Sequence, residues 1–361
     1  MKNFKFVLAG LLFFVLPFSI IAQGGESSSY SVTKKGLVKT VVSADSTVEQ
    51  LNVLKPIVIF KGKYELDTDN GDSYFSVKSA RLGVQGDVSR KISYKFMVDF
   101  SDNGSFKVLD LCFSFKPHKR LKFTFGQSSL PIFNSYTLSP NVLDFTNRPF
   151  IGKYFNSSRD IGLTAAYSIK QNGYPIALEA GIYNGDGINN PKWTSTPAFA
   201  GRLSFGSMKG FRATAKFYQT RIDATQDYFI WGADLRYATE ALTLETEFMN
   251  KANNGEKAES AQPLSSIYLQ GLYKIPVNSK TFKYIQPALR WDGMGYDLVN
   301  RGLGVNRATV GVNFGLNSDS FTSLFRLNYE HYFNNSMDMS ALFKNSYYNE
   351  SKFSVEFLFV F

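Results

Sequence analysis

The 361-residue sequence has few of the residues from which enzyme sites are usually built, with one cysteine and two histidines. Because a lone cysteine cannot form an internal disulfide, Cys112, which lies between Leu111 and Phe113, is predicted to be a small packing residue. His118 falls in a Lys-Pro-His-Lys turn, and His331 has no serine arranged beside it as a nucleophile. Metal-ligand spacings and glycine-rich phosphate loops are absent as well. The sequence therefore predicts no catalytic residue, no metal site and no cofactor.

Long apolar runs are scarce too. The one such run follows Lys2 and Lys5 and ends at Ala22, a pattern that predicts a secretory signal peptide over residues 1–22. After it, no stretch of about 18 apolar residues occurs, so membrane-spanning helices are not predicted. An exported chain with 16% aromatic residues must shelter its rings in another way. A β-barrel does so by turning them outward to lipid.

Positive charge exceeds negative charge, but it is not concentrated. The whole chain carries 40 Lys and Arg against 30 Asp and Glu, a net charge of +10. The predicted signal peptide removes two lysines and no acids, which leaves +8. Nucleic-acid-binding proteins usually gather such an excess in one patch or helix, whereas here the bases are scattered. No nucleic-acid partner is expected.

Apolar and polar residues alternate with period two in segment after segment, which is typical of strands with one apolar face. Residues 211–217 place two Phe and two Ala on one face and Arg212, Thr214 and Lys216 on the other. Sixteen such strands are predicted, near 54–67, 73–87, 91–102, 105–116, 119–128, 158–169, 174–184, 197–207, 209–220, 226–238, 240–251, 263–275, 281–292, 304–317, 320–333 and 351–361. Most run about 10 to 14 residues, the length that crosses a membrane. The pattern predicts an all-β fold, a transmembrane antiparallel barrel over 53–361.

The connections between these strands alternate in length. Short ones, rich in turn-forming residues, lie near 88–91, 116–119, 171–173, 207–210 and 317–320, and longer ones near 128–158, 185–196, 251–262, 293–303 and 334–350. Short periplasmic turns and long external loops are the barrel pattern, although the links near 68–72 and 102–105 are also short. Residues 23–52, rich in Ser, Thr and charge, predict a mobile periplasmic segment.

The final segment alternates as well and stops on an aromatic residue. Phe357, Phe359 and Phe361 stand at alternate positions at the end of the printed sequence. This resembles the C-terminal strand that the barrel-assembly machinery recognises in outer-membrane barrels. With the predicted signal peptide, it predicts a location in the outer membrane of a Gram-negative bacterium, in contact with outer-membrane lipid.

Several stretches, in order, resemble the phosphate-selective outer-membrane porin family (porin O and P). They are 78–87, 93–100, Phe125-Gly-Gln127 leading to Leu130-Pro-Ile132, Arg159-Asp-Ile-Gly162 and 181–187. The resemblance covers roughly residues 55 to 220. It implies a sixteen-stranded barrel, usually a homotrimer, with a long third loop folded into the channel and with Arg and Lys lining a path for small anions.

The 128–158 link has the composition expected of such an inward loop. It contains three prolines and six aromatic residues, too many rings for an exposed loop. Folding inward would bring bases of the link opposite bases on polar strand faces. The predicted anion path consists of Arg148, Lys153, Arg159, Lys95, Lys122, Arg212, Lys216 and Arg81. Acids such as Asp99, Asp110 and Glu179 share those faces, so the positive charge is less dense than in phosphate-specific members.

The sequence thus favours a passive, anion-preferring porin for phosphate, polyphosphate or other small anions. A general non-specific porin and a plugged adhesion or scaffold barrel fit the same pattern, and only channel conductance separates them. An outer-membrane barrel enzyme fits less well, because neither histidine lies beside a nucleophile.

Overall fold

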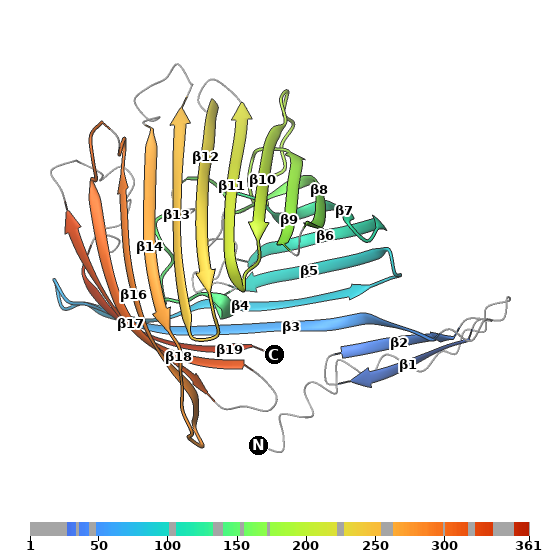
Figure 1. The fold of residues 1–361 in the computed structure, drawn as a ribbon, viewed down its shortest axis with the longest axis horizontal. Coiled ribbons are helices and arrows are strands. Elements are labelled where there is room, and N and C mark those ends of the chain that lie inside the picture. The colour runs from blue at the N-terminus through green and yellow to red at the C-terminus, as the bar shows by residue number, and fades with distance from the viewer. Residues whose placement is uncertain are drawn as a thin grey trace.

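Antiparallel strands make up nearly all of the computed structural model, which describes residues 27–33, 36–42, 48–100, 106–132, 140–151, 155–171, 174–221, 227–253, 263–298, 300–316, 322–334 and 350–360. The strands are β1 Ser27–Thr33, β2 Gly36–Val42, β3 Val48–Asp67, β4 Ser73–Asp87, β5 Ile92–Phe100, β6 Phe106–His118, β7 Leu121–Ser129, β8 Arg159–Gln171, β9 Tyr174–Tyr183, β10 Ala198–Gly206, β11 Gly210–Arg221, β12 Asp227–Ala238, β13 Leu242–Asn253, β14 Leu264–Tyr273, β15 Ile275–Pro276, β16 Phe282–Gly295, β17 Val305–Leu316, β18 Thr322–Asn334 and β19 Lys352–Val360 (Figure 1). A short 3-10 helix, η1, spans Pro140–Val142. No helix in these described ranges is long and apolar enough to cross a membrane.

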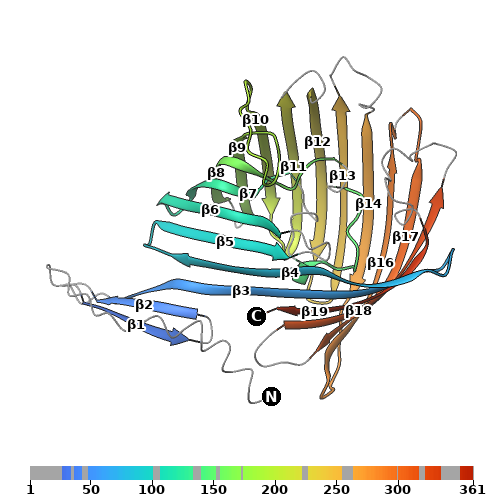
Figure 2. The same ribbon diagram turned by 180° about the vertical axis from the view of Figure 1, so that it is seen from behind.

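Strands β3 to β19 close into one barrel. Each strand pairs with the next along the chain, the short β15 continues β14 beside β16, and β19 pairs with β3 in the register Glu356↔Lys63. The turned view shows β3 running beside β19, so the first and last barrel strands form the seam (Figure 2). Sixteen strands therefore form the closed sheet, as the alternation predicts, and no barrel strand is left with an unpaired edge. The largest difference from the predicted bounds is β3, which begins at Val48 rather than near residue 54.

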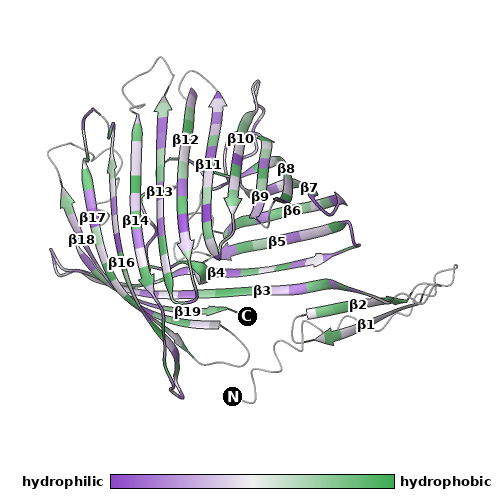
Figure 3. Cartoon of the chain, viewed as in Figure 1, coloured by the Kyte–Doolittle hydropathy of each residue, from purple (hydrophilic) through white to green (hydrophobic). Residues whose placement is uncertain are grey.

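The barrel exposes apolar side chains outward and encloses charged ones. On β11, Phe211 and Phe217 remain 49% and 43% exposed, whereas Lys216 between them in the alternation is only 5% exposed. Figure 3 shows the same alternation of hydrophilic and hydrophobic residues along the strands. A soluble protein buries its large apolar residues instead. An apolar outer surface of this extent is the surface that a lipid bilayer covers.

Short turns lie at one end of the barrel and longer connections at the other. Two to four residues join β4 to β5 at 88–91, β6 to β7 at 119–120 and β8 to β9 at 172–173. The strands run antiparallel, so the links after β7, β9 and β13 leave the opposite end. The short link at 68–72 lies at that opposite end. The predicted alternation of short and long connections is therefore confirmed for these links, and the link at 68–72 is the short exception that the sequence predicts.

An N-terminal hairpin extends the sheet beyond the barrel. β1 pairs with β2, and β2 pairs with the first residues of β3, in the register Val42↔Val48. Valines and threonines in these segments favour extended pairing. The sequence predicted a mobile segment over 23–52 and did not anticipate these strands, although its mobility and periplasmic location remain predictions. The predicted signal peptide lies outside the described residues.

The predicted assembly signal is described only in part. Phe357 on β19 is 37% exposed, and its ring centroid lies 6.2 Å from that of Phe325 on β18 and 4.6 Å from that of Phe359. These contacts belong to the aromatic outer surface near the seam. Phe361 lies outside the described residues.

Candidate functional site

The polar faces of the strands enclose the candidate site, the interior of the barrel. Because successive side chains of a strand point to opposite faces, the apolar outer residues fix every second residue as inward-pointing. Charged groups removed from water in this way are costly unless they are paired. The interior charges are accordingly paired across neighbouring strands, and the pairing differs between two parts of the wall.

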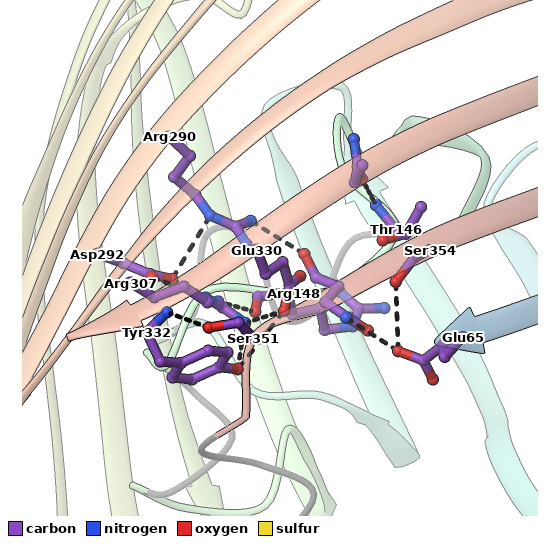
Figure 4. A network of polar contacts seen from close by, with 12 residues as sticks. Glu65, Thr146, Arg148, Arg290, Asp292, Arg307, Glu330, Tyr332, Ser351 and Ser354 are labelled. Carbon is purple, nitrogen blue, oxygen red and sulfur yellow. Dashed lines mark hydrogen bonds and ion pairs between the residues drawn. The ribbon is translucent and has the colours of Figure 1, made fainter. Parts of the chain in front are cut away.

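Inward side chains of β3 and of β16 to β19 form the first part, which we call the paired wall. It consists of Lys61, Lys63, Glu65, Arg290, Asp292, Arg307, Arg326, Glu330 and Glu356, all buried. Lys61 Nζ lies 2.6 Å from Glu356 Oε2, and Arg326 also donates to Glu356. Arg307 bridges two acids, with Nη2 2.5 Å from Asp292 Oδ2 and Nη1 3.2 Å from Glu330 Oε2 (Figure 4). Carboxylates on the same strand or on the neighbouring strand therefore compensate most of the positive charge of this wall.

Residues 140–151 of the 128–158 link lie on the paired wall and turn main-chain carbonyls toward it. Three consecutive carbonyl oxygens accept hydrogen bonds, that of Thr146 from Lys61 Nζ at 2.8 Å, that of Asn147 from Arg290 Nη1 at 3.0 Å and that of Arg148 from Arg307 Nη2 at 2.8 Å. Two rings of the link, Phe145 and Phe150, lie 4.6 Å from the guanidinium carbons of Arg290 and Arg307. The bases of this wall are thus already bound to carboxylates, carbonyls and rings.

Apolar contacts hold the described residues near both ends of the link against inward-facing residues of the strands. Leu130, Ile132, Ile151 and Phe155 pack with inward-facing residues near the long-loop end of the wall, including Tyr183, Ala198, Ala200, Tyr218, Ile230, Met249 and Met294. Every member of this set is almost fully buried. Burial of this much apolar surface away from lipid fixes the described parts of the link to the strands.

One acid of the link, Asp144, is poised to change charge near neutral pH. Gln270 Nε2 donates to its Oδ2 at 3.0 Å. Burial raises the pKa of Asp144 to about 6, and the nearby charge of Glu245 raises it further, against the opposing effect of neighbouring arginines. Its carboxyl therefore gains a proton when the medium becomes mildly acidic.

Inward side chains of β4 to β9 form the second part, which we call the open wall. They line a cavity of about 520 Å³ toward the short-turn end, together with Asn52 and Lys55 of β3. Its charged residues are Lys55, Lys95, Lys122, Asp87, Asp110 and Glu179. Asp110 forms an ion pair with Lys95 at 2.7 Å and accepts a hydrogen bond from Arg159 Nε at 3.0 Å, and Glu179 is paired with Arg202. Within the described part of the chain, no ion pair engages Lys55 or Lys122.

The predicted anion-path residues are divided among these regions. Lys95 and Lys122 line the cavity, and Arg159 is joined to Lys95 through Asp110. Arg81 lies on the open wall but outside the cavity lining, and it pairs with Asp99 at 2.9 Å. Arg212 and Lys216 each lie 2.8 Å from Asp234, Arg148 belongs to the link, and Lys153 lies outside the described residues. The cavity and the ion pairs at its edge therefore bring three of the eight together.

The sequence did not identify five other residues of the cavity lining. Four of them carry hydroxyl groups and the fifth is a lysine, namely Ser93, Ser114, Thr124, Thr164 and Lys55. Each hydroxyl lies on the polar face of its own strand, which the alternation predicts. Their alignment depends on the pairing register between strands, which alternation does not specify.

Similarities to known proteins agree with this architecture. Residues 59–225 match the sequence profile of the family described as phosphate-selective porin O and P. No curated protein matches the chain. Among solved structures, OmpF of Salmonella typhi in complex with daunomycin is 13% identical, with a TM-score of 0.61 over 85% of this chain and 97% of that one. The outer membrane channel DcaP of Acinetobacter baumannii is 14% identical, with a TM-score of 0.56 over 85% and 97%. The trimer form of OmpT of Vibrio cholerae is 12% identical, with a TM-score of 0.52 over 86% and 99%.

The structural likenesses show the fold, and the profile match confirms the resemblance that the sequence motifs indicate. Together they support an outer-membrane porin channel and a location in the outer membrane. Over residues 59–225, the chain is similar to the phosphate-selective porins O and P, and its strands form the sixteen-stranded antiparallel barrel of outer-membrane porins.

Proposed function

We propose that the protein is a passive outer-membrane diffusion channel that prefers anions. The observation that carries this proposal is the charge around the cavity. Five bases line it or pair with its acids, Lys55, Lys95, Lys122, Arg159 and Arg202, against the three acids Asp87, Asp110 and Glu179, which leaves an excess of two positive charges. A narrow polar pore with such an excess attracts anions, because its surroundings screen charge less than bulk water does.

The 128–158 link would narrow this channel. Its described residues occupy the paired wall, which leaves the open wall as the side along which an ion can pass. In the proposed arrangement, Arg148 and Lys153 contribute positive charge at the constriction, opposite Lys95, Lys122 and Arg159 of the open wall. An entering anion would exchange part of its hydration for charge-assisted hydrogen bonds weak enough to permit release.

Phosphate or polyphosphate is the more specific proposal for the solute of this channel. The family resemblance supports it, whereas Asp110 and Glu179 reduce the net charge along the path. A general non-specific porin would have the same fold. A plugged adhesion or scaffold barrel would differ in carrying no current, and an outer-membrane enzyme would require a catalytic centre that the proposal does not include.

Ion selectivity in a planar bilayer tests the proposal. In a KCl gradient, the reversal potential of the purified protein should lie on the chloride side, and Arg148→Glu combined with Lys153→Glu should move it toward potassium. Added phosphate should reduce the chloride current if phosphate occupies the same path. A cation-selective wild-type channel, or a barrel that inserts without conducting, would contradict the proposed function. Anion selectivity without phosphate block would remove only phosphate as the solute.

Assembly gives a second, independent proposal. We propose a homotrimer in outer-membrane lipid, inserted by the barrel-assembly machinery through recognition of Phe357, Phe359 and Phe361. Deleting Phe361 should lower the amount of folded, detergent-resistant barrel, whereas Phe229→Ala on an internal strand should leave assembly largely intact. Native mass measurement in mild detergent should give three chains, and a monomer alone would refute the trimer.

A further inference from the structure

Small inward side chains create the hollow in the open wall. Strand pairing aligns Ser93, Ser114, Thr124 and Thr164, on β5 to β8, in one row that we call the hydroxyl row. In the row above, Cys112 lies opposite Gly126, whose φ of +112° and lack of space beside the Leu111 carbonyl exclude a larger residue. The wall recedes at Cys112 and Gly126 because these residues project little from it, whereas Lys95 in the same row is long.

Lysines border the hydroxyl row on both sides. Pairing places Lys55 opposite Gln85 and Gln85 opposite Lys95, in the row toward the long-loop end. On the other side, Lys122 lies four residues from Gly126 along β7, which corresponds to about 14 Å at 3.4 Å per residue. A ligand seated on the hydroxyls would therefore have an ammonium group within reach on either side.

The hydroxyl row can both donate and accept hydrogen bonds. Ser114 Oγ and Thr124 Oγ1 are 2.9 Å apart, and Thr164 Oγ1 lies 2.7 Å from the hydroxyl of Tyr183. A hydroxyl supplies one donor and two acceptor positions, so each can still bind a ligand hydroxyl. This complements a polyhydroxylated molecule, whereas an inorganic anion would use only the donors.

We infer that the open wall is a binding site for an anionic sugar, a hydroxylated ring that carries a phosphate or carboxylate group. The inference rests on the proposed channel and names its solute class. The ring would lie on the hydroxyl row, and Lys95 or Lys122 would bind the anionic group. A volume of about 520 Å³ falls in the range of about 300–1,000 Å³ typical of small-molecule sites and is much larger than one phosphate requires.

Current block tests this site. Glucose 6-phosphate should reduce the chloride current reversibly. It should do so at a concentration at least about tenfold lower than glucose or inorganic phosphate requires. Glucose lacks the anionic group that the lysines bind, and inorganic phosphate lacks the hydroxylated ring. Ser114→Ala with Thr124→Val should abolish the advantage over inorganic phosphate, and Lys122→Gln should abolish the advantage over glucose. The matched control is Ser204→Ala, an inward hydroxyl on β10 outside the cavity lining, which should leave the block unchanged.

Cys112 supplies a second readout, because it lines the cavity and is the only cysteine of the chain. Its thiolate can attack an anionic methanethiosulfonate reagent, which forms a mixed disulfide on Cys112 and releases methanesulfinate. Modification should lower the current and should proceed severalfold more slowly in the presence of glucose 6-phosphate, but not with inorganic phosphate. Cys112→Ala should be unaffected by the reagent.

The outcomes separate the two proposals. A channel that does not conduct would defeat the porin function itself. A channel that conducts and prefers anions, but in which glucose 6-phosphate neither blocks nor protects Cys112, would overturn the sugar site alone. A thiol that the reagent cannot reach in the empty, conducting channel would also overturn it, because the cavity would then not open to the pore.

Discussion

The paired wall and the open wall consist of the same kind of strand, with the same alternation of polar and apolar residues. Their inward charged residues nevertheless have different roles. On the paired wall, Arg326 is bound by Glu356 and by the carbonyl oxygen of Leu143 at 2.5 Å, with almost no exposed surface. On the open wall, Lys122 is exposed on a cavity and has no described ion-pair partner. The side chains are similar in charge and both point inward. What differs is whether an acid or a carbonyl occupies the adjacent position, so an inward base stabilises the barrel in one place and is available to a solute in the other.

The largest expected effect comes from breaking the paired wall. Glu356→Gln should destabilise the barrel by about 3–5 kcal/mol, because it leaves the buried bases Lys61 and Arg326 without this carboxylate. The midpoint of urea unfolding, followed by the gel shift between folded and heated protein, measures the loss. Glu356→Gln combined with Lys61→Met and Arg326→Met should recover part of the lost stability, because no unpaired base then remains. If the single variant is as stable as the wild type, the division into two walls is wrong.

An open-wall substitution should change selectivity and leave stability nearly unchanged. Lys122→Glu adds negative charge beside the cavity, so the reversal potential in a KCl gradient should move toward potassium, while the free energy of unfolding changes by less than about 1 kcal/mol. Lys209→Glu, in the exposed short turn after β10, is the matched control and should shift the potential less. Equal shifts from the two variants would show that total charge, rather than the cavity, sets selectivity.

The smallest expected effect is a pH dependence from Asp144. Its folded-state pKa of about 6 lies above the usual value for aspartate, so the folded channel holds this proton more tightly than the unfolded chain does. Its contribution to stability is complete below the ordinary pKa and is lost as the pH rises through 6. Between pH 7 and pH 5 protonation also removes a negative charge from the link, so the reversal potential should move by a few millivolts toward chloride. Asp144→Asn should lose this part of the pH response, and an unchanged response would assign it to other groups.

The sequence was sufficient for the barrel but not for its interior. Alternation places Phe211 and Phe217 outward and Lys216 inward, and the structure agrees. Period two defines the face of a residue within its strand and carries no information on its neighbour across the sheet. Lys216 lies between Asp234 and Glu247 because pairing puts Thr214 opposite Asp234 and Asp234 opposite Glu247.

The candidate site shows the same limit. Lys95 and Lys122 could be assigned to the channel wall from their own strands, and both line the cavity. The alignment of Ser93, Ser114 and Thr124 depends on two separate pairings, one of which shifts at a bulge between Met97 and Val98. Bulges move the register by one residue and leave no reliable trace in a single sequence. The hydroxyl row could therefore be found only with the strands in place.

The ion pair between Lys61 and Glu356 favours the correct register between the first and last strands of the barrel. These residues lie on the first and last barrel strands, so they meet only when the sheet closes on itself. A seam displaced by two residues in the direction that puts Glu356 opposite Glu65 would keep every side chain on its proper face but would move Glu356 about 7 Å along β3, away from Lys61. The displaced barrel would contain a buried charge without its partner, an error of several kcal/mol. The pairing of Lys61 with Glu356 therefore disfavours a seam that is displaced in this direction.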